Sequence, residues 1–183
     1  MKTLKYISGV FKLQLIVAAI FVFSSFITGN QSGNFNEDSI KGMFIYNFTR
    51  YIDWSATDAK PDFQIAVIGA SGITEQLNVI ASRKKVNNRN IIVRTLSPTD
   101  DFEGVQIVFI AKHNNLKSRE LINYIKSKGI LIITEESDII HNGAHINLTT
   151  FDGKVKFEVN EENIRKDGIK ISKELLQLAV IKN

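Results

Sequence analysis

Several short groups of residues have the types that ligand binding or catalysis requires, beginning with the loop Val67–Gly72. It reads Val-Ile-Gly-Ala-Ser-Gly between an apolar stretch and a helical pattern, and free backbone N–H groups at such a place can bind a phosphate. The third glycine of a dinucleotide-binding loop is missing, however, and Arg94 stands where an acidic residue would hold a ribose. We therefore expect a tight turn in which Gly72 supplies conformational freedom and Ser71 can cap the next helix.

The sequence gives little support for a catalytic nucleophile or for a metal site. A hydrolase triad would have to combine Ser71 with His113 and Asp138, but Ser71 is followed directly by glycine and is not in a G-x-S-x-G elbow. His141 and His145 fall in a turn that runs into a strand, so their spacing does not place two imidazoles on one helix face. We expect both to be solvent-exposed, and we predict no enzyme activity, no metal and no cofactor.

Carboxylates gather after one buried strand, as Glu135, Glu136 and Asp138. Open α/β sheets place their ligand sites at the carboxyl ends of the strands. One hypothesis is therefore a small-ligand-binding protein of the periplasm, with Ser71, Gly72 and Glu135 at that edge of the sheet.

The N-terminus predicts export. Lys2, Lys5 and Lys12 precede an apolar run, Leu13–Ile27, that contains no acidic residue, which is typical of a secretory signal peptide. Fifteen residues is short of the roughly 20 that a membrane-spanning helix needs. Small residues follow, so we expect cleavage near Gly29. The prediction is a signal peptide over residues 1–29 and a single periplasmic domain over residues 30–183.

Charge and cysteine content exclude several classes of protein. The chain has a formal net charge of +4, but without the predicted leader 20 basic residues face 19 acidic ones. Basic residues do not cluster with interleaved aromatics, so nucleic acid is not an expected partner. The chain has no cysteine, which excludes disulfides, thiolate metal sites and cysteine nucleophiles.

The elements that position these residues begin with an aromatic helix over Lys41–Ser55. Asn34 or Asn36 can cap it, and we expect Phe44, Phe48 and Tyr51 in the core. The face expected to be buried has helical spacing and comprises Ile40, Met43, Phe44, Asn47, Phe48, Tyr51 and Ile52.

Strands and helices then alternate, which predicts an α/β fold with a largely parallel sheet covered by helices on both faces. An antiparallel hairpin is expected near the C-terminus, turning at Asp152-Gly153. The expected strands are residues 63–68, 90–94, 105–111, 130–134, 144–149 and 154–159, and the expected helices are residues 73–83, 116–127 and 172–182.

The order of these segments resembles one known family. Lys41–Trp54, with the sequence Lys-Gly-Met-Phe-Ile-Tyr-Asn-Phe-Thr-Arg-Tyr-Ile-Asp-Trp, resembles the opening helix of the YfiR-like family. No single matching segment is specific for the family, but the whole set of segments, in the same order from about Ser39 to Ile181, is specific. The further matching segments are Ile65–Gly69, Asn88–Arg94, Gln106–Ile110, Leu131–Thr134, Gly143–Asn147, Lys156–Asn160 and Gly168–Ser172.

The resemblance implies an exported, non-enzymatic regulator in the periplasm. It implies binding to the periplasmic domain of a membrane-bound diguanylate cyclase or of a sensor histidine kinase. In that family the regulator restrains the cyclase, and the resemblance implies that relief of this restraint raises cyclic di-GMP and favours biofilm. Members of the family that are regulated through disulfides carry cysteines, and this chain has none, so the resemblance implies no thiol–disulfide control for it. A homodimer is left open. Excess apolar surface is expected at the candidate partner contacts Ile45, Tyr46, Trp54, Leu176 and Val180.

Overall fold

The structure is a computed structural model that describes residues 36–54, 61–69, 71–112 and 118–182. These residues belong to one compact unit, 35–183. The predicted signal peptide and its cleavage site lie outside the described residues. Within those residues, no helix has both the length and the apolar character that crossing a membrane would require.

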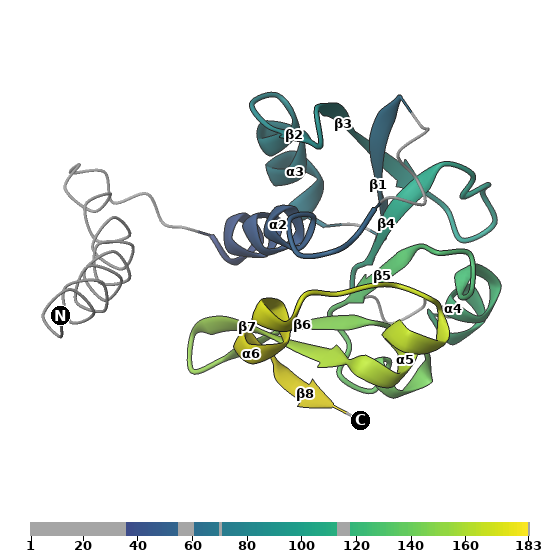
Figure 1. The fold of residues 1–183 in the computed structure, drawn as a ribbon. Helices are drawn as coiled ribbons and strands as arrows, with labels where there is room; N and C mark the ends of the chain where they lie inside the picture. Colours follow the sequence, from purple (N-terminus) through teal and green to yellow (C-terminus); the bar gives the residue numbers. More distant parts are fainter. Residues whose placement is uncertain (1–35, 55–60, 70, 113–117, 183) are drawn as a thin grey trace, which may run out of the picture. The chain divides into compact units, whose positions relative to one another are not determined.

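Helices and strands alternate along most of this unit (Figure 1). The helices are α2 (Glu37–Phe48), α3 (Ile73–Ala81), α4 (Ser118–Ile125), α5 (Glu161–Lys166) and α6 (Lys173–Leu178), with a 3-10 turn, η2 (Ile140–Asn142). The strands are β1 (Asp62–Ile68), β2 (Lys85–Val86), β3 (Arg89–Leu96), β4 (Val105–Ile110), β5 (Leu131–Thr134), β6 (Ile146–Phe151), β7 (Lys154–Asn160) and β8 (Val180–Lys182).

The described strands form one eight-stranded sheet in the order β2-β3-β1-β4-β5-β6-β7-β8. The central strands β3, β1, β4, β5 and β6 are parallel. The β6–β7 pair is the predicted hairpin, and its turn residues Asp152 and Gly153 have φ of 49° and 67°. After β3 the chain passes back over β1 to β4, so the strand order reverses between β1 and β4. The carboxyl ends of the parallel strands near such a reversal are the usual ligand edge of an open α/β sheet.

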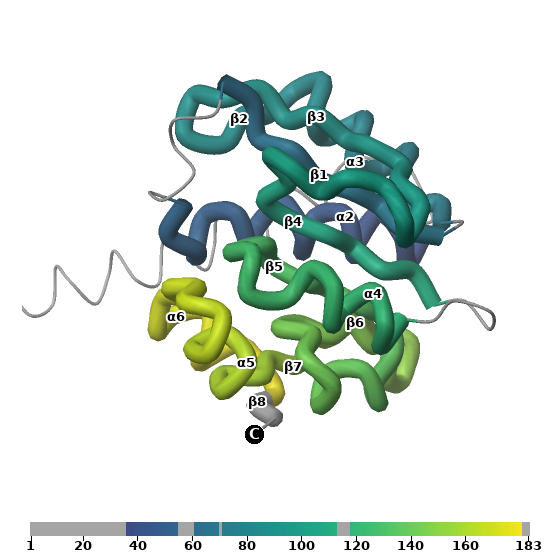
Figure 2. The backbone as a smooth tube through the Cα atoms, turned by 90° about the vertical axis from the view of Figure 1, so that its right-hand side faces the viewer, coloured from purple at the N-terminus to yellow at the C-terminus, as the bar shows by residue number. Residues whose placement is uncertain are grey.

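Both faces of the central strands are covered because their apolar residues point alternately to two separate cores. In β1, Phe63 and Ile65 belong to a core shared with α2, α3, α5 and α6, whereas Ala66 and Ile68 belong to a core shared with α4. Figure 1 shows α2 and α3 on one side of β1 and β4 and α4 on the other side, and Figure 2 gives the same arrangement from a second direction. The predicted α/β fold is confirmed.

The first helix buries a different face from the one predicted. Ile45 and Phe48 are fully buried, while Met43, expected in the core, is 42% exposed. The reason is that α2 packs against α3 as well as against the sheet. Ser39 Oγ donates to Gln76 Oε1 of α3 at 2.9 Å, and a Cβ on Gly42 would come within 3.3 Å of Gln76 Cβ. Of the two predicted caps, Asn36 accepts the backbone N–H of Asp38 at 2.6 Å.

The aromatic residues of α2 pack on the sheet as expected. The ring of Phe157 in β7 lies 5.1 Å from that of Phe48 and 5.5 Å from that of Phe44, measured between centroids. Phe48 is buried, and Phe44 and Tyr51 are partly buried against the same core. The prediction that these three residues belong to the core is confirmed.

The C-terminal segment differs from the predicted closing helix over residues 172–182. Ser172 caps α6 by accepting the backbone N–H of Leu175 at 3.3 Å, but the helix ends at Leu178. Val180 then begins β8, which pairs in parallel with β7. A β-branched residue suits an extended strand, and the strand satisfies backbone groups along the edge of β7. Apolar content alone did not distinguish a helix from an edge strand.

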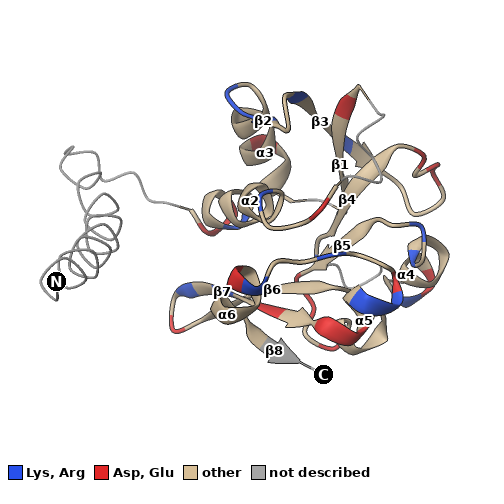
Figure 3. Ribbon diagram, viewed as in Figure 1, with Lys and Arg blue, Asp and Glu red and all other residues tan. Residues whose placement is uncertain are grey.

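The short helix α5 is stabilised by its N-cap and by the order of its charged residues. Asn160 caps it by accepting the backbone N–H of Asn163 at 2.9 Å. Its first turn is acidic and its last turn is basic, as Figure 3 shows, and this distribution complements the helix dipole. The helix contributes Ile164 to the core.

Candidate functional site

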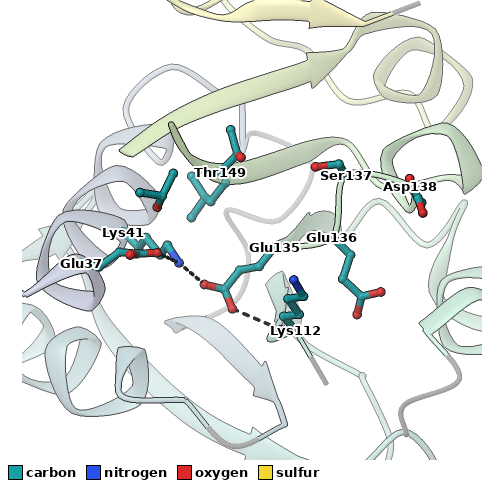
Figure 4. Close-up of a pocket in the computed structure, with 10 residues that line it drawn as sticks. Glu37, Lys41, Lys112, Glu135, Glu136, Ser137, Asp138 and Thr149 are labelled. Carbon is teal, nitrogen blue, oxygen red and sulfur yellow. Dashed lines mark hydrogen bonds and ion pairs between the residues drawn. The ribbon is translucent and has the colours of Figure 1, made fainter. Parts of the chain in front are cut away.

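A pocket of about 580 Å³ opens at the carboxyl ends of β4 and β5 (Figure 4). It combines acidic, basic and hydroxyl side chains from α2, from the segments after β4 and β5, and from β6. The described residues that line it are Glu37, Lys41, Lys112, Glu135, Glu136, Ser137, Asp138, Leu148, Thr149 and Thr150.

The floor of the pocket is a buried ion pair between Lys41 and Glu135. The side chain of Lys41 is only 9% exposed and that of Glu135 only 14%. Lys41 Nζ contacts Glu135 Oε1 and lies 2.5 Å from Glu37 Oε1, one helical turn earlier in α2. The second oxygen of Glu135 accepts the backbone N–H of Lys112 at 3.1 Å. Glu135 therefore joins α2 to the ends of both β4 and β5.

These contacts keep the floor of the pocket charged. Burial alone would lower the pKa of Lys41, but its hydrogen bonds to Glu135 and Glu37 outweigh burial and raise that pKa. The pKa of Glu37 is lowered chiefly by its hydrogen bond from Lys41 and further by one from Thr150. Lys41 is thus held as an ammonium between two carboxylates, as a buried charge requires.

The outer wall is formed by the segment after β5. Its backbone turns at Glu136, whose N–H donates to Thr134 Oγ1 at 3.2 Å. The carboxylate of Glu136 accepts the hydroxyl of Ser118 at 3.3 Å, and Ser118 is buried at the start of α4. Figure 4 shows the Glu136 carboxylate directed away from the Lys41–Glu135 pair. One end of the Glu136 side chain is therefore fixed while the residue stays partly accessible.

The structure separates the residues proposed as one ligand site. Glu135 lies in the pocket, but Ser71 and Gly72 are not among the described residues that line it. Ser71 Oγ accepts the backbone N–H of Ile73 at 3.2 Å, but the N-cap of α3 is Gly72 and the helix has no side-chain cap, so the prediction that Ser71 caps it is wrong. A Cβ on Gly72 would come within 2.2 Å of the carboxylate of Asp38. Gly72 therefore permits the close approach of α2 to α3.

The candidate partner contacts differ in exposure. Ile45 is 0% exposed and Trp54 only 4%, so the expectation that they form an outer rim of the first helix is wrong. Trp54 is enclosed because its indole N–H donates to the carbonyl of Thr49 and its ring packs edge-on against Phe63. Tyr46 and Leu176 are partly buried against the core, and Val180 is 50% exposed.

One of the two turn histidines differs from expectation. His141 is exposed, but His145 is completely buried. Its Nδ1 accepts the backbone N–H of Ile132 at 2.9 Å, so the proton of the neutral ring is on Nε2, which lies 3.1 Å from Asp167 Oδ2. His145 thus joins β5 to the end of α5. His113 lies outside the described residues, and in the described part of the chain no cluster of three or more acidic, cysteine or histidine residues could hold a metal.

The His145–Asp167 pair predicts a dependence of stability on pH. The hydrogen bond from His145 lowers the pKa of Asp167 below its ordinary value. This contribution to stability is complete above about pH 4 and is lost as pH falls through the lower pKa of the folded state. We expect Asp167→Asn to cost about 1 kcal/mol at pH 7 and to lose less stability than the wild type between pH 4 and pH 2. Urea unfolding at several pH values measures both effects. An unchanged pH profile in Asp167→Asn would contradict this assignment, and Asp152→Asn, at the exposed turn between β6 and β7, is the control.

The most important residue that sequence reasoning missed at the site is Lys41. It lies four residues before Ile45 and seven before Phe48, so it falls on the buried face of α2. A charged residue within an apolar helix face indicates a buried ion pair. The face predicted from the sequence did not include Lys41, so this signal was missed. Glu135 was identified because it directly follows a buried strand.

The fold and site together define a class: an α/β domain with a reversed strand order, a polar pocket at the carboxyl edge and an apolar C-terminal end. A model of the YfiR/HmsC-like family matches residues 38–180. The chain therefore belongs to the YfiR/HmsC-like family. Members of this family are regulators rather than enzymes, and membership suggests a periplasmic regulator of diguanylate cyclase signalling.

Comparison with other proteins adds information on the fold alone. A search of curated proteins found no match. Among solved structures, the chain resembles the crystal structure of an ABC domain in complex with L-Trp from Streptococcus pneumonia, with a TM-score of 0.52 and 11% sequence identity. The match covers 79% of this chain and 59% of that one. This chain therefore spans a little over half of that protein.

Proposed function

We propose that this protein is an exported, non-enzymatic regulator that binds the periplasmic part of a membrane sensor protein and restrains it. The sensor is a diguanylate cyclase or a sensor histidine kinase. The observation that supports this most strongly is the family match over residues 38–180. Capture of a sensor of either kind from detergent-solubilised membranes by the immobilised protein tests the proposal.

The surface proposed for this contact is the C-terminal surface, which we define as Leu176, Leu178 and Val180. Leu178 is 68% exposed and Val180 50% exposed. They lie at α6 and β8, and β8 is the last strand of the sheet, so its outer edge is not paired within the described residues. Exposed apolar side chains beside an open strand edge are features that favour binding of another protein. Tyr46 remains a second candidate contact.

Val180→Asp is expected to weaken partner binding at least about tenfold without unfolding the protein, because an unpaired charge would have to be desolvated at the interface. The matched control is Val79→Asp. Val79 has a similar exposure, 46%, but lies on α3, at the opposite end of the sheet from β8 (Figure 1). Binding of the purified variants to the captured sensor checks this expectation. Equal loss of binding in both variants would remove the support for the C-terminal surface.

A second candidate function is binding of a small ligand at the carboxyl edge of the sheet. The pocket around Glu135 favours it, because its volume of about 580 Å³ falls within the range of ordinary ligand sites. Ser71 and Gly72, the other residues first proposed there, have structural roles at α3 instead. In this second function, the protein would either be regulated by the bound ligand or serve as the binding protein for that ligand.

A further inference from the structure

We propose that the outer side of β3 binds an extended, acidic segment of a partner protein, which adds a strand to the sheet. The binding surface, which we call the β3 edge, comprises residues Ile91–Leu96. It lies near the opposite end of the sheet from β8, so it is distinct from the C-terminal surface. The inference goes beyond the proposed function and does not depend on which membrane sensor is bound.

The first observation is that β3 is only partly covered on its outer side. β2 is the last strand at this end of the sheet, and its two residues pair with Arg89 and Asn90 alone. Among the residues that the structure describes, no strand pairs with the outer side of Ile91–Leu96. These six residues span about 20 Å, which is the length of an ordinary strand.

The direction of the backbone groups follows from the hairpin between β2 and β3. Its two-residue turn, Asn87-Asn88, has φ of 48° and 64°, as a type I′ turn requires. In such a hairpin the flanking residues, Val86 and Arg89, direct their N–H and C=O groups toward each other. Because this direction alternates along a strand, the backbone groups of Val93 and Thr95 also point outward. They are the donors and acceptors that strand addition uses.

The β3 edge lacks the features that usually prevent strand addition. Residues 91–96 contain no proline and no lysine, and their pairing with β1 shows no bulge. Arg94 is the only charged residue among these six. Its guanidinium donates to Gln64 Oε1 of β1 at 3.0 Å, which directs it toward the sheet and away from the edge. Ile92 is 42% exposed and offers an apolar contact to a side chain of the added strand.

The charges at the amino end of the β3 edge indicate the kind of partner. Arg83, Lys84 and Lys85 are consecutive and exposed, and their side chains have no ion-pair partner among the described residues. Lys85 lies across from Asn90. The backbone N–H groups of Arg83 and Lys84 donate to the carbonyl of Ile80, at 3.0 Å and 2.9 Å. The three cations therefore lie at the start of β2, beside the point where the open edge begins (Figure 3).

The three cations outnumber the acidic residues near this end of the edge. Glu75 lies in the first turn of α3, and Asp62 accepts from the side-chain amide of Asn90 at 3.5 Å. The segment 55–60, which precedes β1, contains one aspartate and one lysine, so it adds no net charge. The acidic loop 100–103 follows the other end of β3. A strand with carboxylates is therefore attracted to the amino end of the edge, and a basic strand is repelled.

Three peptides of nine residues test the inference by fluorescence anisotropy with the whole mature protein at about 0.1 M salt. The first has a core of alternating threonine and valine with two glutamates at each end. The second has lysines in place of the glutamates, and the third is the acidic peptide N-methylated at its core amides. We expect the acidic peptide to bind at least about tenfold more tightly than the other two, because only this peptide has both the carboxylates and the backbone donors.

Two kinds of variant separate the charges from the strand edge. Lys84→Glu/Lys85→Glu is expected to weaken binding of the acidic peptide at least about tenfold. The matched control is Lys154→Glu/Lys156→Glu, which makes the same change of charge at exposed lysines of β7 and should have little effect. Thr95→Pro removes an outward N–H but keeps the pairing with β1, so it should also weaken binding at least about tenfold. Thr95→Val keeps the N–H and should bind like the wild type.

Urea unfolding checks that each variant is folded, and the lysine variants test the inference even if Thr95→Pro does not fold. Equal binding of the acidic peptide and either of the other two peptides would overturn the inference. Acidic-peptide binding that is unchanged in Lys84→Glu/Lys85→Glu, or in folded Thr95→Pro, would also overturn it.

The alternative role of the basic residues is contact with a lipid surface, and vesicles that contain phosphatidylglycerol test it. If no peptide binds the wild type, but the vesicles bind it and do not bind Lys84→Glu/Lys85→Glu, the cations serve a membrane surface and the inference is wrong. Sensor capture tests the C-terminal surface and is independent of each of these results.

Discussion

Lys41→Met is expected to destabilise the folded protein by about 3 kcal/mol, because it leaves the carboxylate of Glu135 buried without its cation. The pair is almost completely enclosed, with side-chain exposures of 9% and 14%. The remaining contact of Glu135, with the backbone N–H of Lys112 at 3.1 Å, does not neutralise the charge. The free energy of unfolding in urea at pH 7 measures the effect.

The double variant Lys41→Met/Glu135→Gln separates loss of the charge pair from loss of packing. It removes both charges, so we expect it to recover most of the stability lost in Lys41→Met, because a neutral amide at residue 135 needs no cation. If the single and double variants are equally unstable, the loss comes from packing of the lysine stem rather than from an unpaired carboxylate. Glu37→Gln is the control for the more exposed partner and should have a small effect.

Ile45→Ala is also expected to cost about 3 kcal/mol, since it removes a fully buried side chain from the core between α2 and the sheet. Met43→Ala, two residues away, should change stability by no more than about 0.5 kcal/mol because Met43 is 42% exposed. The same urea unfolding experiment measures both. The reverse order of effects would mean that α2 buries the face first expected from its sequence.

Much of the fold could be predicted because the strands are short apolar runs between turn residues. β4 and β5 are buried on both faces, and such strands read as continuous apolar segments. The hairpin between β6 and β7 was evident from Asp152-Gly153. The face that α2 buries could not be predicted in the same way, because it depends on packing against α3, where residues such as Ser39 and Gln76 meet although they are 37 positions apart in sequence.

The candidate site was predictable only in part, for a similar reason. Glu135 follows a buried strand, and the topology of α/β sheets places that position at the ligand edge. Lys41 and Thr149 reach the same pocket from α2 and β6, and their meeting depends on tertiary packing. His145 likewise looked like a turn residue, but the backbone N–H of Ile132 and the carboxylate of Asp167 supply buried partners for both ring nitrogens.

The C-terminal segment shows how an apolar pattern can be ambiguous. Leu175 packs into the core, as a closing helix predicts, but the chain leaves the helix after Leu178 and adds a strand to the sheet. This change moves Val180 from a helix face to a sheet edge. The residue remains a candidate for partner contact, and the geometry proposed for that contact becomes the end of a sheet.

The most direct test of the proposed function is capture of membrane proteins by the immobilised mature protein from detergent-solubilised membranes of its own source, with identification by mass spectrometry. We expect the wild type and Val79→Asp to retain a membrane protein that has a periplasmic domain and a cyclase or kinase output domain, and we expect Val180→Asp to lose it. Recovery of no such membrane protein by the wild type would contradict the proposal that this family member is a regulator of a membrane sensor.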